Sequence, residues 1–267
     1  MAFPWVKKKV LVTIRTYPIP AQTGIEVSCT GGITDDGKWI RLFPVPYRFM
    51  ETDKRFRKYQ WIDVNVIKSS SDIRPESYKL NIDTINIGKS ISTANQWGAR
   101  KKVVFPLKRS SLCAIKREQE QEENSPTLGI FKPAKIDRLL IEASDKEWTA
   151  EQQSFLSQQL LFSKNTPRQS LEKIPFDFRY EFHCFDDTCS GHKMICTDWE
   201  MGQSYRKWNR QYQSDWEGKF RQRYEEEMIS KLDTHFYVGT VHGHPGAWII
   251  VGLFYPPLSS TLDLFNG

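Results

Sequence analysis

Residues 176–200 read FDFRYEFHCFDDTCSGHKMICTDWE, and the organisation of the chain follows from this stretch. It holds three of the five cysteines of a 267-residue protein. From Phe176 to Cys184 apolar and polar residues alternate, which predicts a β-strand that carries a thiol at its end. Gly191 supplies the backbone freedom that a tight loop after this strand needs. The stretch is therefore predicted to form a metal-binding hairpin.

Structural zinc takes four thiolate or imidazole ligands, often from pairs two to four residues apart. Cys184, Cys189 and His192 fit this spacing and are predicted ligands. Cys196 is a candidate for the fourth place if a helix follows His192, because residues i and i+4 are then neighbours. In an extended strand it would lie about 13 Å from His192, and His183 or a distant residue would take the place. The alternatives are a buried cluster of reduced thiols or an iron–sulfur site.

The composition predicts a protein of a reducing, cytoplasmic environment that has no contact with a membrane. Hydrophobic residues make up 39% and charged residues 26%, and mean hydropathy is −0.55. No apolar run reaches the 18 residues of a membrane span, and no secretory signal opens the chain. An odd number of clustered cysteines fits a metal site better than a disulfide framework.

The charge balance indicates a nucleic-acid partner. The chain carries a net charge of +6, with a pI near 9.0 and 13% aromatic residues. Cations neutralise phosphates and flat rings stack on bases, so this basic and aromatic composition favours DNA or RNA binding. The alternative is a packed aromatic core under a solvated basic surface.

The first seventy residues predict a small barrel or a bent antiparallel sheet. β-prone runs cover residues 10–16, 25–34, 38–43 and 60–68, and an Asp-Asp-Gly turn at 35–37 joins two of them. Residues 124–126 (Asn-Ser-Pro) mark a candidate boundary. We therefore expect a β-rich α+β protein with a barrel-like domain over 1–125 and an α+β domain over 126–267.

The second domain is predicted to combine the metal hairpin with helices and a final β-hairpin. A capping box at Thr149 opens a helix to about Phe162. Aromatic residues then recur at steps of about four between 205 and 224, which predicts a long striped helix. This helix must wind or break, and Gly218 is the expected break. Residues 236–254 read as a β-hairpin.

Basic residues interleaved with rings occur in three segments, and these are the predicted nucleic-acid contacts. The candidates are Lys38, Trp39, Arg41, Arg55, Arg57, Lys58, Arg100, Lys101, Lys102, Arg206, Lys207 and Arg210. In this interpretation the cations position phosphates while the rings stack on bases.

The resulting hypothesis is a nucleic-acid-binding protein with a structural zinc site that acts in a complex with partner proteins. The sequence contains no P-loop, GxGxxG or HExxH motif. An alternative is a metal-dependent nuclease or other hydrolase, in which Asp198 and Glu200 hold a divalent cation or the zinc keeps an open position for water. A third interpretation is a protein-interaction scaffold.

Overall fold

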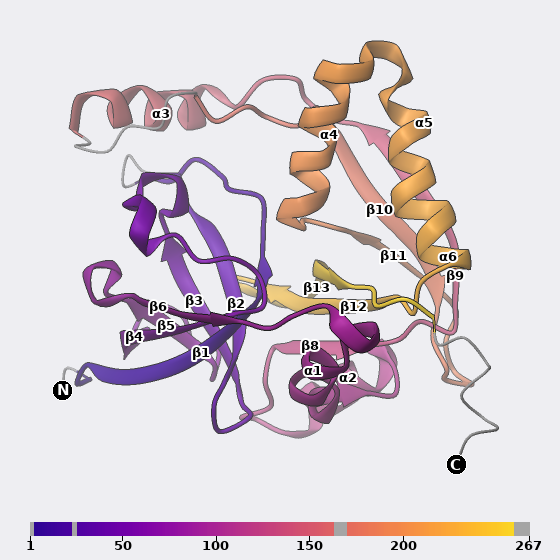
Figure 1. Cartoon of the computed structure of the whole chain (residues 1–267), viewed down its shortest axis with the longest axis horizontal. Helices are drawn as coiled ribbons and strands as arrows, with labels where there is room; N and C mark the ends of the chain where they lie inside the picture. The colour runs from indigo at the N-terminus through magenta and orange to yellow at the C-terminus, as the bar shows by residue number, and fades with distance from the viewer. Residues whose placement is uncertain (1–2, 23–25, 163–169, 259–267) are drawn as a thin grey trace.

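The computed structural model describes residues 3–22, 26–162 and 170–258. Its first part is a closed barrel of five strands (Figure 1). These strands are β1 (Val6–Arg15), β2 (Ser28–Thr34), β3 (Trp39–Val45), β4 (Gln60–Lys68) and β5 (Ser77–Leu80). They follow the order β1-β2-β3-β5-β4, β4 pairs back with β1, and β6 (Asn86–Ser90) extends the sheet beside β4. The expectation of a small N-terminal barrel is confirmed.

The barrel closes because apolar residues alternate along its strands. Val10, Val12, Ile40 and Ile62 belong to the fully buried interior cluster, and Gly37 makes the β2–β3 turn at a φ of +76°. All pairs are antiparallel except β3 with β5. A five-stranded Greek-key barrel of this order is the OB-fold topology.

The second part is built on two adjoining sheets. One has the order β13-β12-β8-β7, and the other the order β11-β10-β9. A parallel bridge between Cys196 and Ile250 joins them. The strands are β7 (Lys108–Arg109), β8 (Leu128–Phe131), β9 (Lys135–Ala143), β10 (Phe176–His183), β11 (His192–Ile195), β12 (His235–Val241) and β13 (His244–Phe254). The predicted β-hairpin is β12 with β13.

The described residues also form six α-helices. They are α1 (Ala94–Val104), α2 (Leu112–Gln121), α3 (Ala150–Phe162), α4 (Trp199–Tyr212), α5 (Trp216–Arg221) and α6 (Glu227–Ser230), with a π-turn over Gln222–Glu226. Short 3-10 turns cover Tyr47–Phe49, Thr52–Lys54, Ile82–Thr84, Phe105–Leu107 and Gln213–Asp215. Among the helices of residues 3–22, 26–162 and 170–258, none combines the length and apolar character that a membrane crossing requires.

The aromatic-striped helical segment is present, but its break lies earlier than expected. The chain reverses at Gln213–Asp215, where Gln213 has a φ of +48°, and α4 and α5 form the helical hairpin at the top right of Figure 1. Gly218 lies inside α5. The reversal turns the stripe onto itself, so that the ring of Tyr205 lies 4.8 Å from that of Trp216. These rings form a hydrophobic core with β10.

The sheet β13-β12-β8-β7, called the C-terminal sheet below, covers one outer face of the barrel. Ile33 and Trp39 pack there against Leu128, Tyr237 and Phe254 in a separate core cluster. This interface therefore buries the outward face of the β2–β3 hairpin.

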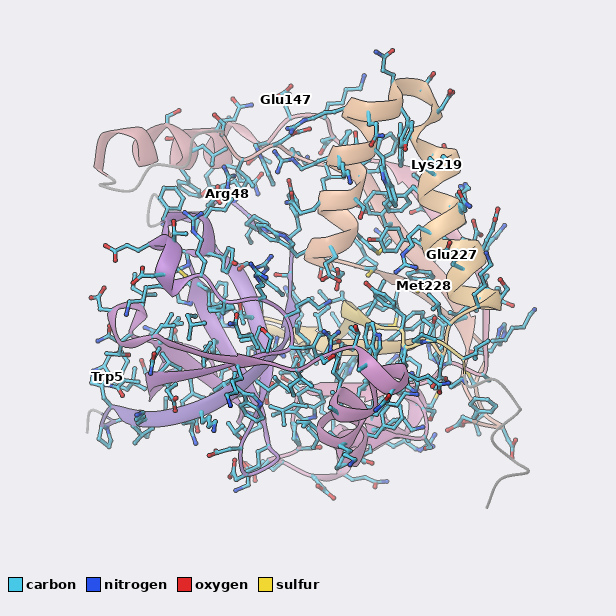
Figure 2. The ribbon with its side chains drawn as sticks, viewed as in Figure 1. Trp5, Arg48, Glu147, Lys219, Glu227 and Met228 are labelled. Atoms are coloured by element: carbon cyan, nitrogen blue, oxygen red, sulfur yellow. The ribbon has the colours of Figure 1, made fainter. Side chains whose placement is uncertain are left out.

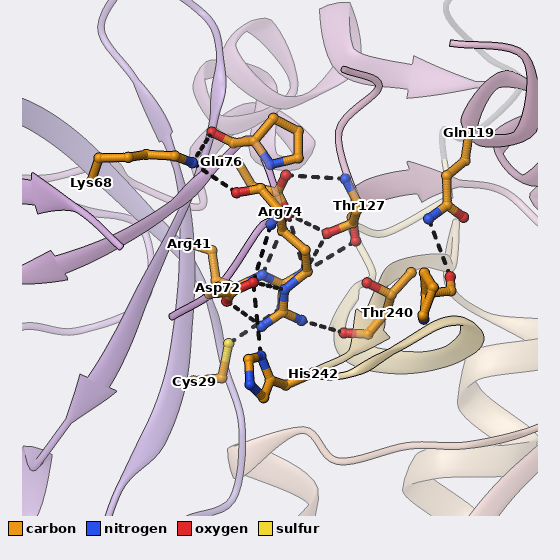
Figure 3. A network of polar contacts seen from close by, with 12 residues as sticks. Cys29, Arg41, Lys68, Asp72, Arg74, Glu76, Gln119, Thr127, Thr240 and His242 are labelled. Carbon is orange, nitrogen blue, oxygen red and sulfur yellow. Dashed lines mark hydrogen bonds and ion pairs between the residues drawn. The ribbon is translucent and has the colours of Figure 1, made fainter. Parts of the chain in front are cut away.

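A buried polar network crosses the same interface (Figure 3). Arg41 forms an ion pair with Glu76 at 3.2 Å and donates to the carbonyl of Thr127 at 3.1 Å. Beside it, Arg74 binds Asp72 and donates to the carbonyl of Thr240. Because buried charges are tolerated only when paired, this network fixes how the two parts of the chain meet.

Candidate metal centre and cationic pocket

Four side chains that can bind a metal ion meet at the end of β10. Cys113, Cys184, Cys189 and His192 place their ligand atoms within 4.8 Å of one another. The Sγ atoms of Cys113 and Cys189 lie 3.3 and 3.4 Å from Nε2 of His192. A tetrahedral ion with standard zinc bond lengths would separate a sulfur and a nitrogen ligand by about 3.5 Å. The cluster could therefore hold a metal ion and is compatible with zinc.

Local backbone structure positions each of these groups. The N–H of Cys184 donates to Sγ of Cys189 at 3.3 Å, and the N–H of Cys189 donates to the carbonyl of Asp186. Gly191 turns the loop at a φ of +93°, a conformation that side chains disfavour. Cys113 enters from the first turn of α2, whose N-cap is Ser111. Helix and hairpin thus meet at one point.

The electrostatics of the cluster favour a bound cation. Burial raises the pKa of the Cys184 thiol, although the backbone N–H groups of Leu112 and Cys113 counteract it. Burial and the neighbouring sulfurs raise the pKa of Cys113 to about 12. Neighbouring thiolates repel one another, and this repulsion contributes to the raised pKa of Cys113. A metal ion binds the thiolate forms and would offset the repulsion between their negative charges.

The fourth member of the cluster is Cys113, and Cys196 lies outside it. β11 is extended from His192 to Ile195, which carries Cys196 away to its bridge with Ile250. His183 pairs with Asp137 at 2.8 Å instead. An ion bound by all four side chains would have no position left for a reacting water, which is the pattern of structural zinc sites.

Several of the predicted basic residues line a second site, a pocket of about 370 Å³ where the barrel, α1 and the start of α4 meet. Its lining residues are Arg15, Tyr47, Arg57, Lys58, Tyr59, Trp97, Arg100, Glu200, Leu253 and Tyr255. We call it the cationic pocket. Both parts of the chain contribute to it. The beginning of α4, which borders the pocket, lies in the middle of Figure 1.

Two arginines of the cationic pocket are held on aromatic rings. The guanidinium of Arg15 lies 4.0 Å from the ring centre of Tyr47 and 4.3 Å from that of Trp199. Arg100 lies 4.1 Å from Tyr59 and 4.6 Å from Trp97. Such stacking engages the faces of a guanidinium and leaves its N–H edges available. The arginines are thus pre-positioned to donate hydrogen bonds.

Lys58 lies at the buried end of the pocket, where it forms ion pairs with two carboxylates. Its Nζ lies 3.1 Å from Oδ2 of Asp198 and 3.1 Å from Oε2 of Glu200. Burial alone would lower the pKa of Lys58, but the two carboxylates outweigh burial and hold it raised. Burial raises the pKa of Asp198, and Lys58 opposes this effect. The pKa of Glu200 is lowered, because Lys58 and Tyr255 overcome its burial.

The backbone beside the pocket is strained. Tyr59, Asn95, Gln96 and Trp97 all have φ between +51° and +63°, a region that non-glycine residues seldom adopt. Strain of this kind costs about 1–3 kcal/mol per residue and clusters at functional sites. Here it aims the rings of Tyr59 and Trp97 at Arg100.

The other predicted contact residues are dispersed. Trp39 and Arg41 are only 8% and 2% exposed because they lie in the interface between barrel and sheet. Lys38 is exposed and paired with Asp36. Arg55, Lys102, Lys207 and Arg210 are exposed, Lys101 is half-buried, and buried Arg206 shares Glu172 with Arg210 on α4.

The sequence interpretation did not identify Arg15, Trp97 and Tyr255 as site residues. Each stands alone in its own segment, and no spacing pattern links the three. Arg15 offered the one local signal, a cation directly after the mostly apolar run VLVTI at residues 10–14.

Residues 108–267 match the family described as "Domain of unknown function (DUF8757)", and residues 6–106 match "Domain of unknown function (DUF8758)". The first match covers more than half of the chain, so the chain belongs to the DUF8757 family. No curated protein matches the sequence.

Two solved structures align with the chain over nearly its whole length. One is described as "Crystal structure of the tetrameric p202 HIN2", with a TM-score of 0.31, 8% identity and coverage of 97% of this chain and 96% of that one. The other is "Structure of murine DNA binding protein bound with ds DNA", with a TM-score of 0.29, 8% identity and coverage of 95% and 96%. Similarity this low supports no conclusion about fold or function.

Proposed function

We propose that this protein binds nucleic acid through the cationic pocket, and that a zinc ion in the Cys113–Cys184–Cys189–His192 cluster stabilises the C-terminal part. One observation carries the proposal. Basic residues from separate segments, Arg15, Arg57 and Arg100, converge with aromatic rings in a single open pocket. Arginine donors and stacking rings are the two groups that bind phosphates and bases.

The barrel has the topology of oligonucleotide-binding barrels, but its usual binding face is covered. OB-type barrels often bind oligonucleotides on the face of strands β2 and β3. In this chain the outward residues Trp39 and Arg41 of β3 are buried by the C-terminal sheet. The pocket lies instead beside Tyr47 and Lys58, in the connection between β3 and β4. The binding surface is therefore composite and needs both parts of the chain.

The geometry favours binding over hydrolysis. Oδ1 of Asp198 accepts from the N–H groups of Glu200 and Met201, and Oδ2 accepts from Lys58 and from the N–H of Leu253. This carboxylate therefore caps α4 and ties it to β13. Lys58 occupies the position between Asp198 and Glu200 that a catalytic cation would need.

Zinc is the ion that the ligand set favours. Three sulfurs and one imidazole nitrogen form a Cys₃His set, and soft thiolates with tetrahedral spacing suit zinc. All five cysteines are free of disulfides, which is consistent with a reducing compartment such as the cytoplasm.

Fluorescence anisotropy with labelled single-stranded DNA, single-stranded RNA and duplexes tests the proposed function. Replacing both Arg57 and Arg100 by Gln should weaken binding about a hundredfold, because each hydrogen bond to a charged group contributes about 1.5–3 kcal/mol. The slope of affinity against salt should also fall by about two.

The matched control replaces two exposed lysines, Lys219 of α5 and Lys231 at the C-terminal end of α6, and removes the same charge. Figure 2 shows Lys219 on the helical hairpin of α4 and α5, far from the barrel that carries Arg48. The control should bind like the wild type. The proposed function is wrong if the wild type binds none of these nucleic acids, or if the two double variants bind equally well.

A further inference from the structure

We propose that the cationic pocket binds a phosphate monoester, the terminal phosphate of a nucleotide or of a nucleic-acid strand. The inference deepens the proposed function and rests on it. Its first support is the net charge of the side chains around the pocket. In the part of the chain that the structure describes, Arg15, Arg57, Lys58 and Arg100 face two carboxylates, Asp198 and Glu200. The site therefore keeps an excess of two positive charges. A phosphate monoester carries between about −1.5 and −2 charges at neutral pH, whereas an internal phosphodiester carries one.

The donors needed for such a group are available. Arg15 lines the pocket, but its Nε is buried and has no hydrogen-bond partner among the described residues, so this arginine would meet a ligand through its terminal nitrogens. Arg100 donates its Nε to the carbonyl of Ile91 at 3.0 Å, so its terminal nitrogens can serve a ligand. The side chain of Arg57 is exposed, and the one hydrogen bond described for this residue comes from its backbone N–H. Guanidinium groups present paired donors that match phosphate oxygens.

The arrangement is rigid, which favours a compact anion. Arg15 and Arg100 are each held on two rings. Lys58 is locked between its carboxylates, with its side chain only 6% exposed. Fixed donors lose little conformational freedom when they bind a ligand, so affinity gains from their pre-organisation. Lys58 supplies charge rather than direct contact.

The size of the pocket and its rings extend the site to the attached nucleoside. A volume of about 370 Å³ is at the small end of ligand pockets and fits one nucleotide unit, not a duplex. The indole of Trp97 and the phenol of Tyr47 line the pocket. Each ring carries an arginine on one face, so a base would stack on the opposite face. The strand would therefore enter by its end.

The test compares one labelled oligonucleotide with a 5′-phosphate, with a 3′-phosphate and with hydroxyls at both ends. Binding is measured by anisotropy, and adenosine 5′-monophosphate is titrated by calorimetry. We expect one end-phosphorylated strand to bind at least tenfold more tightly than the unphosphorylated strand, because one or more charged hydrogen bonds are gained. The strand that gains affinity identifies which end enters.

Variants of the pocket show whether the higher affinity for the phosphorylated strand depends on its arginines. Arg57→Gln and Arg100→Gln should each remove most of the advantage of the phosphorylated strand, whereas Lys219→Gln should retain it. Arg57 is exposed, so its variant remains informative if Arg100→Gln does not fold.

The outcomes separate this inference from the proposed function. Equal binding of all three strands would overturn the inference and leave nucleic-acid binding intact. Binding of the mononucleotide without any strand would support the phosphate site and refute the proposed function. No binding of any of these ligands would refute both.

Discussion

The metal cluster and the cationic pocket are assembled from the chain in different ways. Three of the four side chains that could hold a metal ion lie within residues 184–192, on one hairpin. The cationic pocket takes its residues from the barrel, α1, α4 and β13. A hairpin can place neighbouring ligands by its own geometry, whereas the pocket exists only once the barrel and the C-terminal part have met. The cluster should therefore control folding of its own region, and the pocket should depend on the whole fold.

The largest effect is expected at the metal cluster. Cys113→Ser and Cys184→Ser should both lose the metal and unfold the C-terminal part, because structural zinc binding contributes about 10–16 kcal/mol to small zinc folds. Cys196→Ser should keep the metal. Elemental analysis and thermal unfolding of the purified variants measure this difference. A Cys113→Ser protein with full metal content would contradict the assignment of the fourth ligand.

A smaller loss is expected when the lysine at the buried end of the cationic pocket is removed. Lys58→Met should destabilise the protein by about 3–5 kcal/mol, because it leaves the buried Asp198 without its partner. Denaturant unfolding gives the magnitude, and the metal content should stay unchanged. Lys89, an exposed lysine on β6, provides a control that should lose little. A fully stable Lys58→Met protein would show that the ion pair does not hold the two parts together.

The stability of the protein should depend on pH through Glu26, which pairs with Arg48 of the loop that carries Tyr47. Burial raises the pKa of Glu26 to about 7, although Arg48 at 3.0 Å counteracts it. A carboxyl whose pKa is higher in the folded state stabilises the protein fully below its unfolded pKa, and this contribution is lost as the pH rises through 7.

Between pH 5 and pH 8 the wild type should therefore lose about 2–3 kcal/mol relative to Glu26→Gln. Unfolding curves of both proteins across this range test the expectation. Parallel pH profiles would show that Glu26 is not the titrating group.

The smallest effect is expected from one exposed arginine of the cationic pocket. Arg57→Gln should weaken nucleic-acid binding about tenfold without changing stability, because its guanidinium is exposed and one charged contact is lost. Anisotropy measures affinity, and thermal unfolding confirms the fold. Unchanged affinity would remove Arg57 from the binding site and restrict the pocket to its stacked arginines.

The sequence predicted those site residues that lie close to one another along the chain. Cys184, Cys189 and His192 were identified because a strand and a glycine turn place them together. Cys113 was missed because it lies 79 residues from His192. It has one local signal, its place just after the Ser111 N-cap, where a helix begins. Arg57, Lys58 and Arg100 were predicted as contacts, but nothing predicted that they share a pocket.

By itself the sequence determined the alternating strands of the barrel, the turn at Gly37 and three members of the metal cluster. Each depends on steric and hydrophobic rules that act over a few residues. The tertiary structure alone decided that Cys113 completes the cluster, that Arg41 is buried, and that Lys58 meets Asp198 from 140 residues away. Contacts between distant segments depend on how the barrel and sheets close and pack, and no local pattern carries that information.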